Sequence, residues 1–142
     1  EAVNICFKEM FARIFPGGKG ELKLTDSADM LGTGVDIDIQ IPGKRAQNIS
    51  LLSGGEKSLA AIALIFAILQ YRPAPFLVLD EVDAALDDAN IAVFNRLIRD
   101  VARNSQVILI THNKKTMEVA ENLFGITMQN QGISMLVSVN LN

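Results

Sequence analysis

The chain has 142 residues, of which 49% are hydrophobic and 20% charged, and its formal net charge at pH 7 is −3. This length and composition predict one globular domain with a real hydrophobic core and exclude a disordered chain. The 13 Lys and Arg residues are spread along the sequence, so no basic patch supports nucleic-acid binding by the chain alone.

The sequence also argues against a secreted or membrane protein. The one cysteine, Cys6, cannot form an internal disulfide and suits a reducing compartment. The longest apolar run, residues 59–69, is shorter than the about 20 residues that span a bilayer. We therefore expect a cytoplasmic protein with no membrane partner.

The first 15 residues carry apolar side chains at helical spacing, which predicts an amphipathic helix. These side chains are Val3, Cys6, Phe7, Met10, Phe11 and Ile14. A Pro-Gly-Gly segment at 16–18 predicts the end of the helix. No capping residue precedes it, as would hold for the end of a longer helix, although an ordinary core helix is the simpler interpretation.

Residues 20–25 and 34–41 alternate apolar and polar side chains, which predicts two antiparallel strands with one buried face. We interpret Asp36 and Asp38 as part of the solvated face of the second strand rather than as metal ligands. The segment 42–45 ends the pair.

Residues 53–58, Ser-Gly-Gly-Glu-Lys-Ser, precede the long apolar run. Ser53 with Glu56 three residues later predicts a capping box that opens a buried helix. Such a helix start has free N–H groups and a positive dipole end, so it suits a phosphate. An ordinary capped core helix is the alternative.

Residues 76–79 are apolar at every position, which predicts a strand of a parallel sheet buried on both faces. Asp80 and Glu81 follow directly. Because ligands bind at the carboxyl ends of strands in open α/β sheets, this acidic pair favours a functional role.

A second apolar strand is predicted at residues 107–110, and it is followed by Thr111, His112 and Asn113. Asp87 or Asp88 is expected to cap the helix between the two strands. A strand, helix and strand with short joins form a right-handed crossover, so the two strands should be parallel. Their ends would then bring His112 near Asp80 and Glu81.

The remainder of the sequence predicts a last helix over residues 114–123 and a hairpin. The hairpin strands are expected at residues 125–129 and 133–139, and we expect them to close the sheet.

The helix start, the acidic pair and the histidine are together the parts of a nucleotide hydrolase. Asp80 would hold Mg²⁺ through water, Glu81 would polarise the attacking water, and His112 would donate to the γ-phosphate of ATP.

Four segments in sequence order resemble the motifs of ABC-type ATPases: a signature motif at 52–57, a Walker B strand at 76–81, a D-loop at 85–87 and a switch-histidine loop at 111–113. The amino-acid sequence at 81–87 and 111–118 is similar to that of the C-terminal head lobe of a bacterial structural maintenance of chromosomes (SMC) protein. Transport ATPases usually have Gln after the signature glycines and Glu-Pro-Thr after the Walker B Asp, which this chain lacks.

The resemblance implies an α/β fold, the C-terminal half of an ABC-type (P-loop NTPase) head, with parallel core strands flanked by helices plus antiparallel hairpins. Residues 1–15 would be the end of the coiled-coil helix that enters the head. Residues 16–142 would be the head lobe.

A phosphate loop (Walker A) of the form Gly-x-x-x-x-Gly-Lys-Ser/Thr is absent from the sequence. The segment 17–20 has Gly after its Lys, and Glu56 stands where the segment before Ser58 needs Gly. In SMC proteins this loop belongs to the N-terminal lobe. The chain alone is therefore expected to bind ATP poorly and not to turn it over.

By the family pattern, two heads enclose two ATP molecules with Mg²⁺. Ser53, Gly54 and Gly55 would reach the γ-phosphate held by the opposite head, and Asp87 would line the interface between heads. The resemblance also places Lys57 among the residues that face ATP, but it assigns this lysine no specific role. ATP would join the heads and hydrolysis would release them.

The resemblance implies as partners the N-terminal head lobe, a second SMC head, a kleisin subunit, and DNA through the full complex. The process would be chromosome condensation and segregation at the nucleoid. A RecN- or RecF-like repair ATPase is an alternative, as is a lobe that serves chiefly as a platform for the winged-helix domain of a kleisin.

Overall fold

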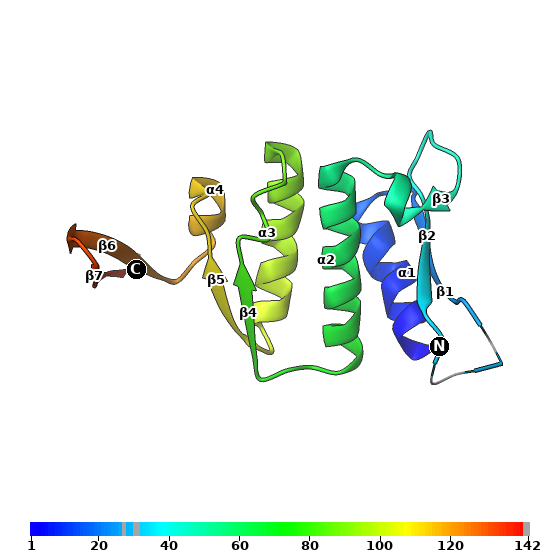
Figure 1. The fold of residues 1–142 in the computed structure, drawn as a ribbon, viewed down its shortest axis with the longest axis horizontal. Coiled ribbons are helices and arrows are strands. Elements are labelled where there is room, and N and C mark those ends of the chain that lie inside the picture. The colour runs from blue at the N-terminus through cyan, green and yellow to red at the C-terminus, as the bar shows by residue number, and fades with distance from the viewer. Residues whose placement is uncertain (27, 30–31, 141–142) are drawn as a thin grey trace.

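A computed structural model describes residues 1–26, 28–29 and 32–140, so residues 27, 30, 31, 141 and 142 of the predicted lobe lie outside it. The elements are α1 (Ala2–Ile14), β1 (Lys19–Leu24), β2 (Val35–Gln40), β3 (Gln47–Asn48), the 3-10 turn η1 (Ile49–Leu51), α2 (Gly54–Tyr71), β4 (Phe76–Asp80), α3 (Asp88–Ala102), β5 (Gln106–Ile110), α4 (Lys114–Met117), β6 (Asn122–Asn130) and β7 (Ile133–Asn140). Figure 1 shows the β1–β2–β3 sheet at one end of the long axis, then α1, α2 and α3, then the strands β4 and β5 with α4, and the β6–β7 hairpin at the other end.

The strands form one parallel and two antiparallel groups, which confirms the predicted α/β fold with antiparallel hairpins. The sheet β1–β2–β3 is antiparallel, and β1 pairs with β2 from Lys19 opposite Gln40 to Leu24 opposite Val35. The strands β4 and β5 are parallel, from Phe76 beside Gln106 to Asp80 beside Ile110. The crossover through α3 thus places both carboxyl ends at one edge, as predicted.

The predicted first helix is confirmed, and it lies between α2 and the antiparallel sheet (Figure 1). Phe7 and Phe11 are fully buried. A Cβ at Gly20 of β1 would lie 2.7 Å from Cγ of Phe11, so only glycine lets the strand approach the helix this closely. The aromatic side chains of α1 therefore set the distance between helix and sheet.

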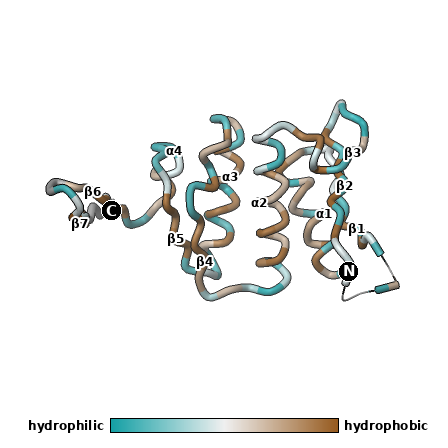
Figure 2. The backbone as a smooth tube through the Cα atoms, in the orientation of Figure 1, coloured by the Kyte–Doolittle hydropathy of each residue, from teal (hydrophilic) through white to brown (hydrophobic). Residues whose placement is uncertain are grey.

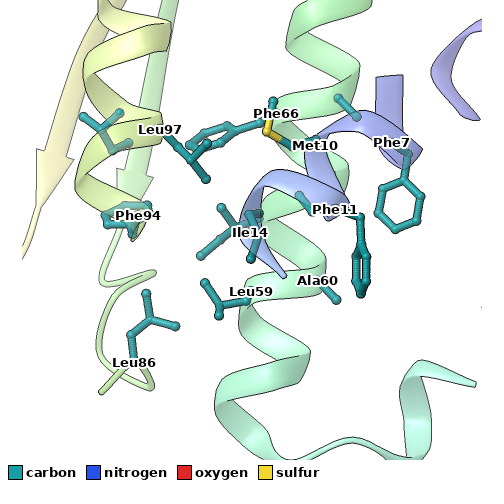
Figure 3. Packing of buried hydrophobic residues seen from close by; sticks show 14 of the residues in the cluster. Phe7, Met10, Phe11, Ile14, Leu59, Ala60, Phe66, Leu86, Phe94 and Leu97 are labelled. Atoms are coloured by element: carbon teal, nitrogen blue, oxygen red, sulfur yellow. The ribbon is translucent and has the colours of Figure 1, made fainter. Parts of the chain in front are cut away.

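The long helix α2 is the middle layer of the core. Its alanines allow close approach, and its larger buried residues pack toward α1 on one side and α3 on the other. Figure 3 shows Ile14, Leu59, Phe66, Phe94 and Leu97 from these three helices pointing toward one another.

The prediction that β4 and β5 are buried on both faces is wrong for this chain. Leu79 is buried, but the alternate residues are exposed: Phe76, Val78, Ile108 and Ile110. We call these four residues the open face. The helices cover one side of the strand pair only, and within the described residues no element covers the other, although both strands are apolar along their length (Figure 2).

Two further expectations for the last 30 residues are corrected. The last helix ends at Met117, because tight hydrogen bonds from the Val119 and Ala120 N–H groups turn the chain before β6 begins at Asn122. The hairpin forms, but it is a separate two-stranded sheet that does not pair with β4 or β5. In Figure 1 it lies beyond α4, at the end of the molecule.

We expect Gly20→Ala to destabilise the domain by about 1–3 kcal/mol, because the new methyl group would overlap rings that have no room to move. The matched control is Gly54→Ala, where an added Cβ meets no described atom within 4 Å. This control should change the free energy of unfolding by less than about 0.5 kcal/mol. Urea denaturation measures both, and equal effects would contradict the close packing at Gly20.

Candidate functional site

The start of α2 has the predicted capping box. The hydroxyl of Ser53 accepts from the Glu56 N–H at 3.4 Å, and the Glu56 carboxylate accepts from the Ser53 N–H at 3.1 Å. Ser53, Gly54 and Lys57 are exposed. The helix start therefore faces solvent while its first turn is held in place.

Lys44 offsets the negative charge that Glu56 brings to this helix start. Its ammonium group donates to the Glu56 carboxylate at 2.7 Å. This hydrogen bond, with the one from Ser53, holds the pKa of Glu56 below its usual range. Because the pair is neutral overall, the positive end of the α2 dipole stays available for an anion.

The two glycines at the start of α2, Gly54 and Gly55, differ in their surroundings. A Cβ at Gly54 would meet no described atom within 4 Å, whereas one at Gly55 would lie 3.2 Å from the carbonyl oxygen of Ala85. Gly55 thus lets α2 pack against the turn after β4, and Gly54 leaves room for an approaching ligand.

The ends of β4 and β5 bring Glu81 and His112 together, as predicted, and Asp80 lies beside Ile110 at the end of the same strand pair. The Glu81 N–H donates to the Ile110 carbonyl at 2.9 Å and extends the pairing by one residue. Nδ1 of His112 lies 3.6 Å from Oε1 of Glu81. The two side chains are 75% and 60% exposed, so they face open space rather than a closed pocket.

Glu81 has a φ of 47°, in the left-handed region. For a residue with a Cβ this costs on the order of 1–2 kcal/mol, and such strain gathers at functional sites. The strained backbone directs Glu81 away from the line of β4 and toward His112.

Asp87, rather than Asp88, caps α3, since its carboxylate accepts from the Asn90 N–H at 2.9 Å. In Figure 1 the starts of α2, α3 and α4 and the carboxyl ends of β4 and β5 share the upper edge. All of the sequence-predicted site residues belong to this edge: Ser53, Gly54, Gly55, Lys57, Asp80, Glu81, Asp87 and His112.

Sequence reasoning missed Asp83, which is only 3% exposed. Its carboxylate accepts from the hydroxyls of Thr111 at 2.7 Å and Thr116 at 2.5 Å. The sequence gives one signal for it, an acidic residue between Glu81 and Asp87 in a turn that also contains apolar residues. That signal does not reveal burial, because the partners are distant in sequence.

The edge is an open surface. Two hollows on the described surface have volumes of about 340 and 200 Å³, and no predicted site residue lines either one. Among the residues that the structure describes, no three His, Cys, Asp or Glu side chains could hold a metal ion by themselves. The edge therefore offers parts of a site rather than an enclosed one.

No helix in the described ranges is long and apolar enough to cross a membrane.

The strands β4 and β5 are parallel, their carboxyl ends carry two acidic residues and a histidine, and the start of α2 with its two glycines lies at the same edge. This is the architecture of an ABC-type (P-loop) ATPase head. A family model described as "RecF/RecN/SMC N terminal domain" matches residues 22–135. The chain belongs to the RecF/RecN/SMC family.

Among curated proteins, the chain is 52% identical over 99% of its length to the chromosome partition protein Smc of Halobacteriovorax marinus. It is 53% identical over 95% of its length to that of Bacillus subtilis. It spans 12% and 11% of the length of these two relatives.

The solved structures that resemble the chain include SMC heads. One is described as "Crystal structure of the SmcHead bound to the C-winged helix domain of ScpA", with a TM-score of 0.89 and 40% identity, over 99% of this chain and 43% of that one. Another, described as "Structural biochemistry of ATP-driven dimerization and DNA stimulated activation of SMC ATPases", has a TM-score of 0.88 and 38% identity, over 99% and 84%. The SMC head domain from Thermotoga maritima has a TM-score of 0.76 and 44% identity, over 99% and 48%.

The Lys44–Glu56 pair predicts a pH-dependent stability difference. Lys44→Met should lower the free energy of unfolding by about 0.2–1 kcal/mol at pH 7, since the pair is partly exposed. Because the folded-state pKa of Glu56 is depressed, this contribution is present above the ordinary glutamate pKa of about 4.3 and is lost as the pH falls through the lower folded value.

The measurement is urea denaturation of both proteins from pH 7 down to pH 3. The wild type and the variant should converge at the acid end. A difference that stays constant over this range would contradict the ion pair as its source.

Proposed function

We propose that the chain is the C-terminal lobe of an SMC ATPase head, with residues 1–15 as the end of the coiled coil and residues 16–142 as the lobe. In this proposal it binds and hydrolyses ATP only together with the N-terminal, Walker A lobe and a second head. The cycle of head engagement and release would then act in chromosome condensation and segregation.

The observation that carries the proposal is the open face beside the functional edge. Parallel sheets normally have both faces covered, and a contiguous exposed apolar surface favours an interaction site. Val78 and Ile108 are direct neighbours in the register, and Ile110 lies beside Asp80. An N-terminal lobe that covers these residues would bring its phosphate loop to the same edge as Asp80 and Glu81.

The motif content favours the C-terminal lobe. The family description names an N-terminal domain, but the matched residues 22–135 contain the signature, Walker B, D-loop and switch-histidine segments. The phosphate loop that an N-terminal lobe needs does not occur in the sequence.

The roles of the edge residues follow from their chemistry. Asp80 is an exposed carboxylate at the end of β4, which suits Mg²⁺ because this ion usually takes one or two carboxylates together with phosphates and waters. When bound, Mg²⁺ would offset charge on the phosphates. Glu81 would orient and polarise the attacking water, and His112 would donate to the γ-phosphate from the same head.

The signature residues would act on the ATP of the opposite head. Ser53 and Gly54 are exposed, and no phosphate loop of this chain lies beside them. Gly55 keeps the helix start against the turn that leads to Asp87, so both elements could meet a partner head together. Lys57 would add positive charge at the same surface.

The proposed setting is the cytoplasm, at the nucleoid, with DNA held by the full complex rather than by this lobe. The net charge of −3 agrees with that division. The relatives' name, chromosome partition protein, and the ATP-driven dimerization in the description of one structural neighbour support the proposed cycle. A RecN- or RecF-like repair ATPase remains the alternative within the same family.

A kleisin subunit is the further proposed partner. Two structural neighbours are heads bound to the C-terminal part of ScpA. In this chain the β6–β7 hairpin exposes large apolar residues, among them Phe124, Ile126, Leu136 and Val137. A two-stranded hairpin is marginal in water by itself, so a partner that covers it would stabilise it.

The first test mixes this chain with the matching N-terminal lobe and measures ATP turnover. We expect turnover from the mixture and none from either lobe alone. Glu81→Gln in the mixture should reduce turnover by a factor of about 100 or more while ATP binding persists, because it removes the group that polarises the attacking water.

The control is Arg103→Gln, a change at an exposed position at the C-terminal end of α3, away from the edge and outside the motif segments. It should hydrolyse ATP at the wild-type rate. Robust turnover by this chain alone, or wild-type turnover by the Glu81→Gln mixture, would contradict the proposal.

A further inference from the structure

Asp83 is the buried acidic group that the proposed mechanism does not use. A carboxylate is seldom buried unless it is paired or hydrogen-bonded, because desolvation costs several kcal/mol. Both of its recorded partners are neutral hydroxyls, and both bond to the same oxygen, Oδ2. An Asp placed only to stabilise the fold would gain more from a cationic partner, so these two donors need an explanation.

The two donors flank His112. Thr111 precedes it directly, and Thr116 follows it within the next helical turn. The hydroxyl of Thr111 also accepts from the Asn113 N–H at 2.9 Å. Asp83 thus fixes a hydroxyl that in turn fixes the backbone on the far side of His112.

Two further contacts join the segment that carries His112 to α3. The Asn95 side chain donates to the Lys115 carbonyl at 2.7 Å, and the Lys115 ammonium group lies 2.8 Å from the Asp88 carboxylate. The segment 111–116 is therefore fastened at several points to the turn after β4 and to α3. Of the side chains on this turn and on α3 that contact the segment 111–116, Asp83 is the most deeply buried.

His112 itself has little to hold it. Its side chain is largely exposed, and within the described residues its one recorded polar contact is the Glu81 carboxylate at 3.6 Å. At that distance, between exposed groups, the attraction contributes little. The position of the imidazole is therefore set by the backbone of its own segment.

We propose that Asp83 is a positioning residue that holds the His112 segment, through Thr111, so that the imidazole stays beside Glu81 at the proposed ATP site. This inference rests on the proposed function. A misplacement of about 1 Å at a reacting group can reduce a rate about 100-fold. Loss of the Asp83–Thr111 hydrogen bond should accordingly act on turnover rather than on ATP binding.

The test uses three variants. Thr111→Val keeps the shape of the side chain and removes the hydroxyl, Asp83→Ala removes the acceptor oxygen of both hydrogen bonds, and the double variant combines the two changes. In the mixture of lobes each single variant should reduce kcat about 10-fold to 100-fold with little change in KM for ATP. The double variant should be no slower than the worse single variant, because the two residues act as one unit.

Thr111→Ser is the rescue, since it retains the hydroxyl, and it should restore most of the wild-type kcat. Thr116→Val is the matched control. It removes the other donor to Asp83, lowers stability, and leaves the Thr111 contact, so its kcat should stay near the wild-type value. Multiplicative effects of Asp83→Ala and Thr111→Val, or no rescue by Thr111→Ser, would overturn the inference.

A second measurement does not depend on ATP. Amide hydrogen exchange of the isolated chain should be faster over residues 111–117 in Asp83→Ala than in the wild type, with α2 unchanged. Equal exchange in that segment would overturn the inference. If the wild-type mixture does not hydrolyse ATP, the proposed function fails, and the exchange result alone decides whether Asp83 fastens the segment.

Discussion

The packing of α2 between α1 and α3 is the interaction on which the rest of the structure depends. Phe66 and Leu59 of α2, Ile14 of α1, and Phe94 and Leu97 of α3 gather in one part of the core (Figure 3). This layer joins α1 and the antiparallel sheet to α3 and the parallel strands, and an ion pair between Arg13 of α1 and Asp100 of α3 adds a direct contact. Ser53 caps the same helix, so the burial of α2 also fixes the segment that begins at Ser53 beside the turn that leads to Asp87.

Features set by residues close together in the sequence could be predicted from it. Burial that depends on residues far apart in the sequence, or on another chain, could not. The capping box lies within four residues, Ser53 to Glu56, and the parallel pairing of β4 with β5 follows from a short crossover. By contrast, Asp83 is buried because of hydroxyls 28 and 33 residues away. The apolar pattern around Val78 and Ile108 predicts strands buried on both faces. That pattern does not say whether the element that covers each face belongs to the same chain.

The chain combines a well-packed core with an exposed edge that carries the proposed site residues, and the two have different physical origins. Phe7, Phe11 and Phe94 are fully buried, whereas Glu81 and His112 face solvent, and Glu81 has a left-handed backbone. Strain and exposure at one edge, beside an uncovered apolar face, are the features of a surface that other polypeptides complete. The proposed function follows from that edge, and the described fold supplies its rigid support.

The central claim is that Ser53 acts on ATP held by another head, and complementation between two inactive heads tests it most directly. One head combines Ser53→Arg with an intact Walker A lobe, and the other combines wild-type Ser53 with a Walker A lobe whose phosphate-loop Lys is replaced. Each should be inactive alone, and their mixture should recover part of the wild-type ATP turnover, because one site of the mixed dimer is complete. If Ser53 served the ATP of its own head, no site in the mixture would be complete, and the absence of turnover would contradict the claim.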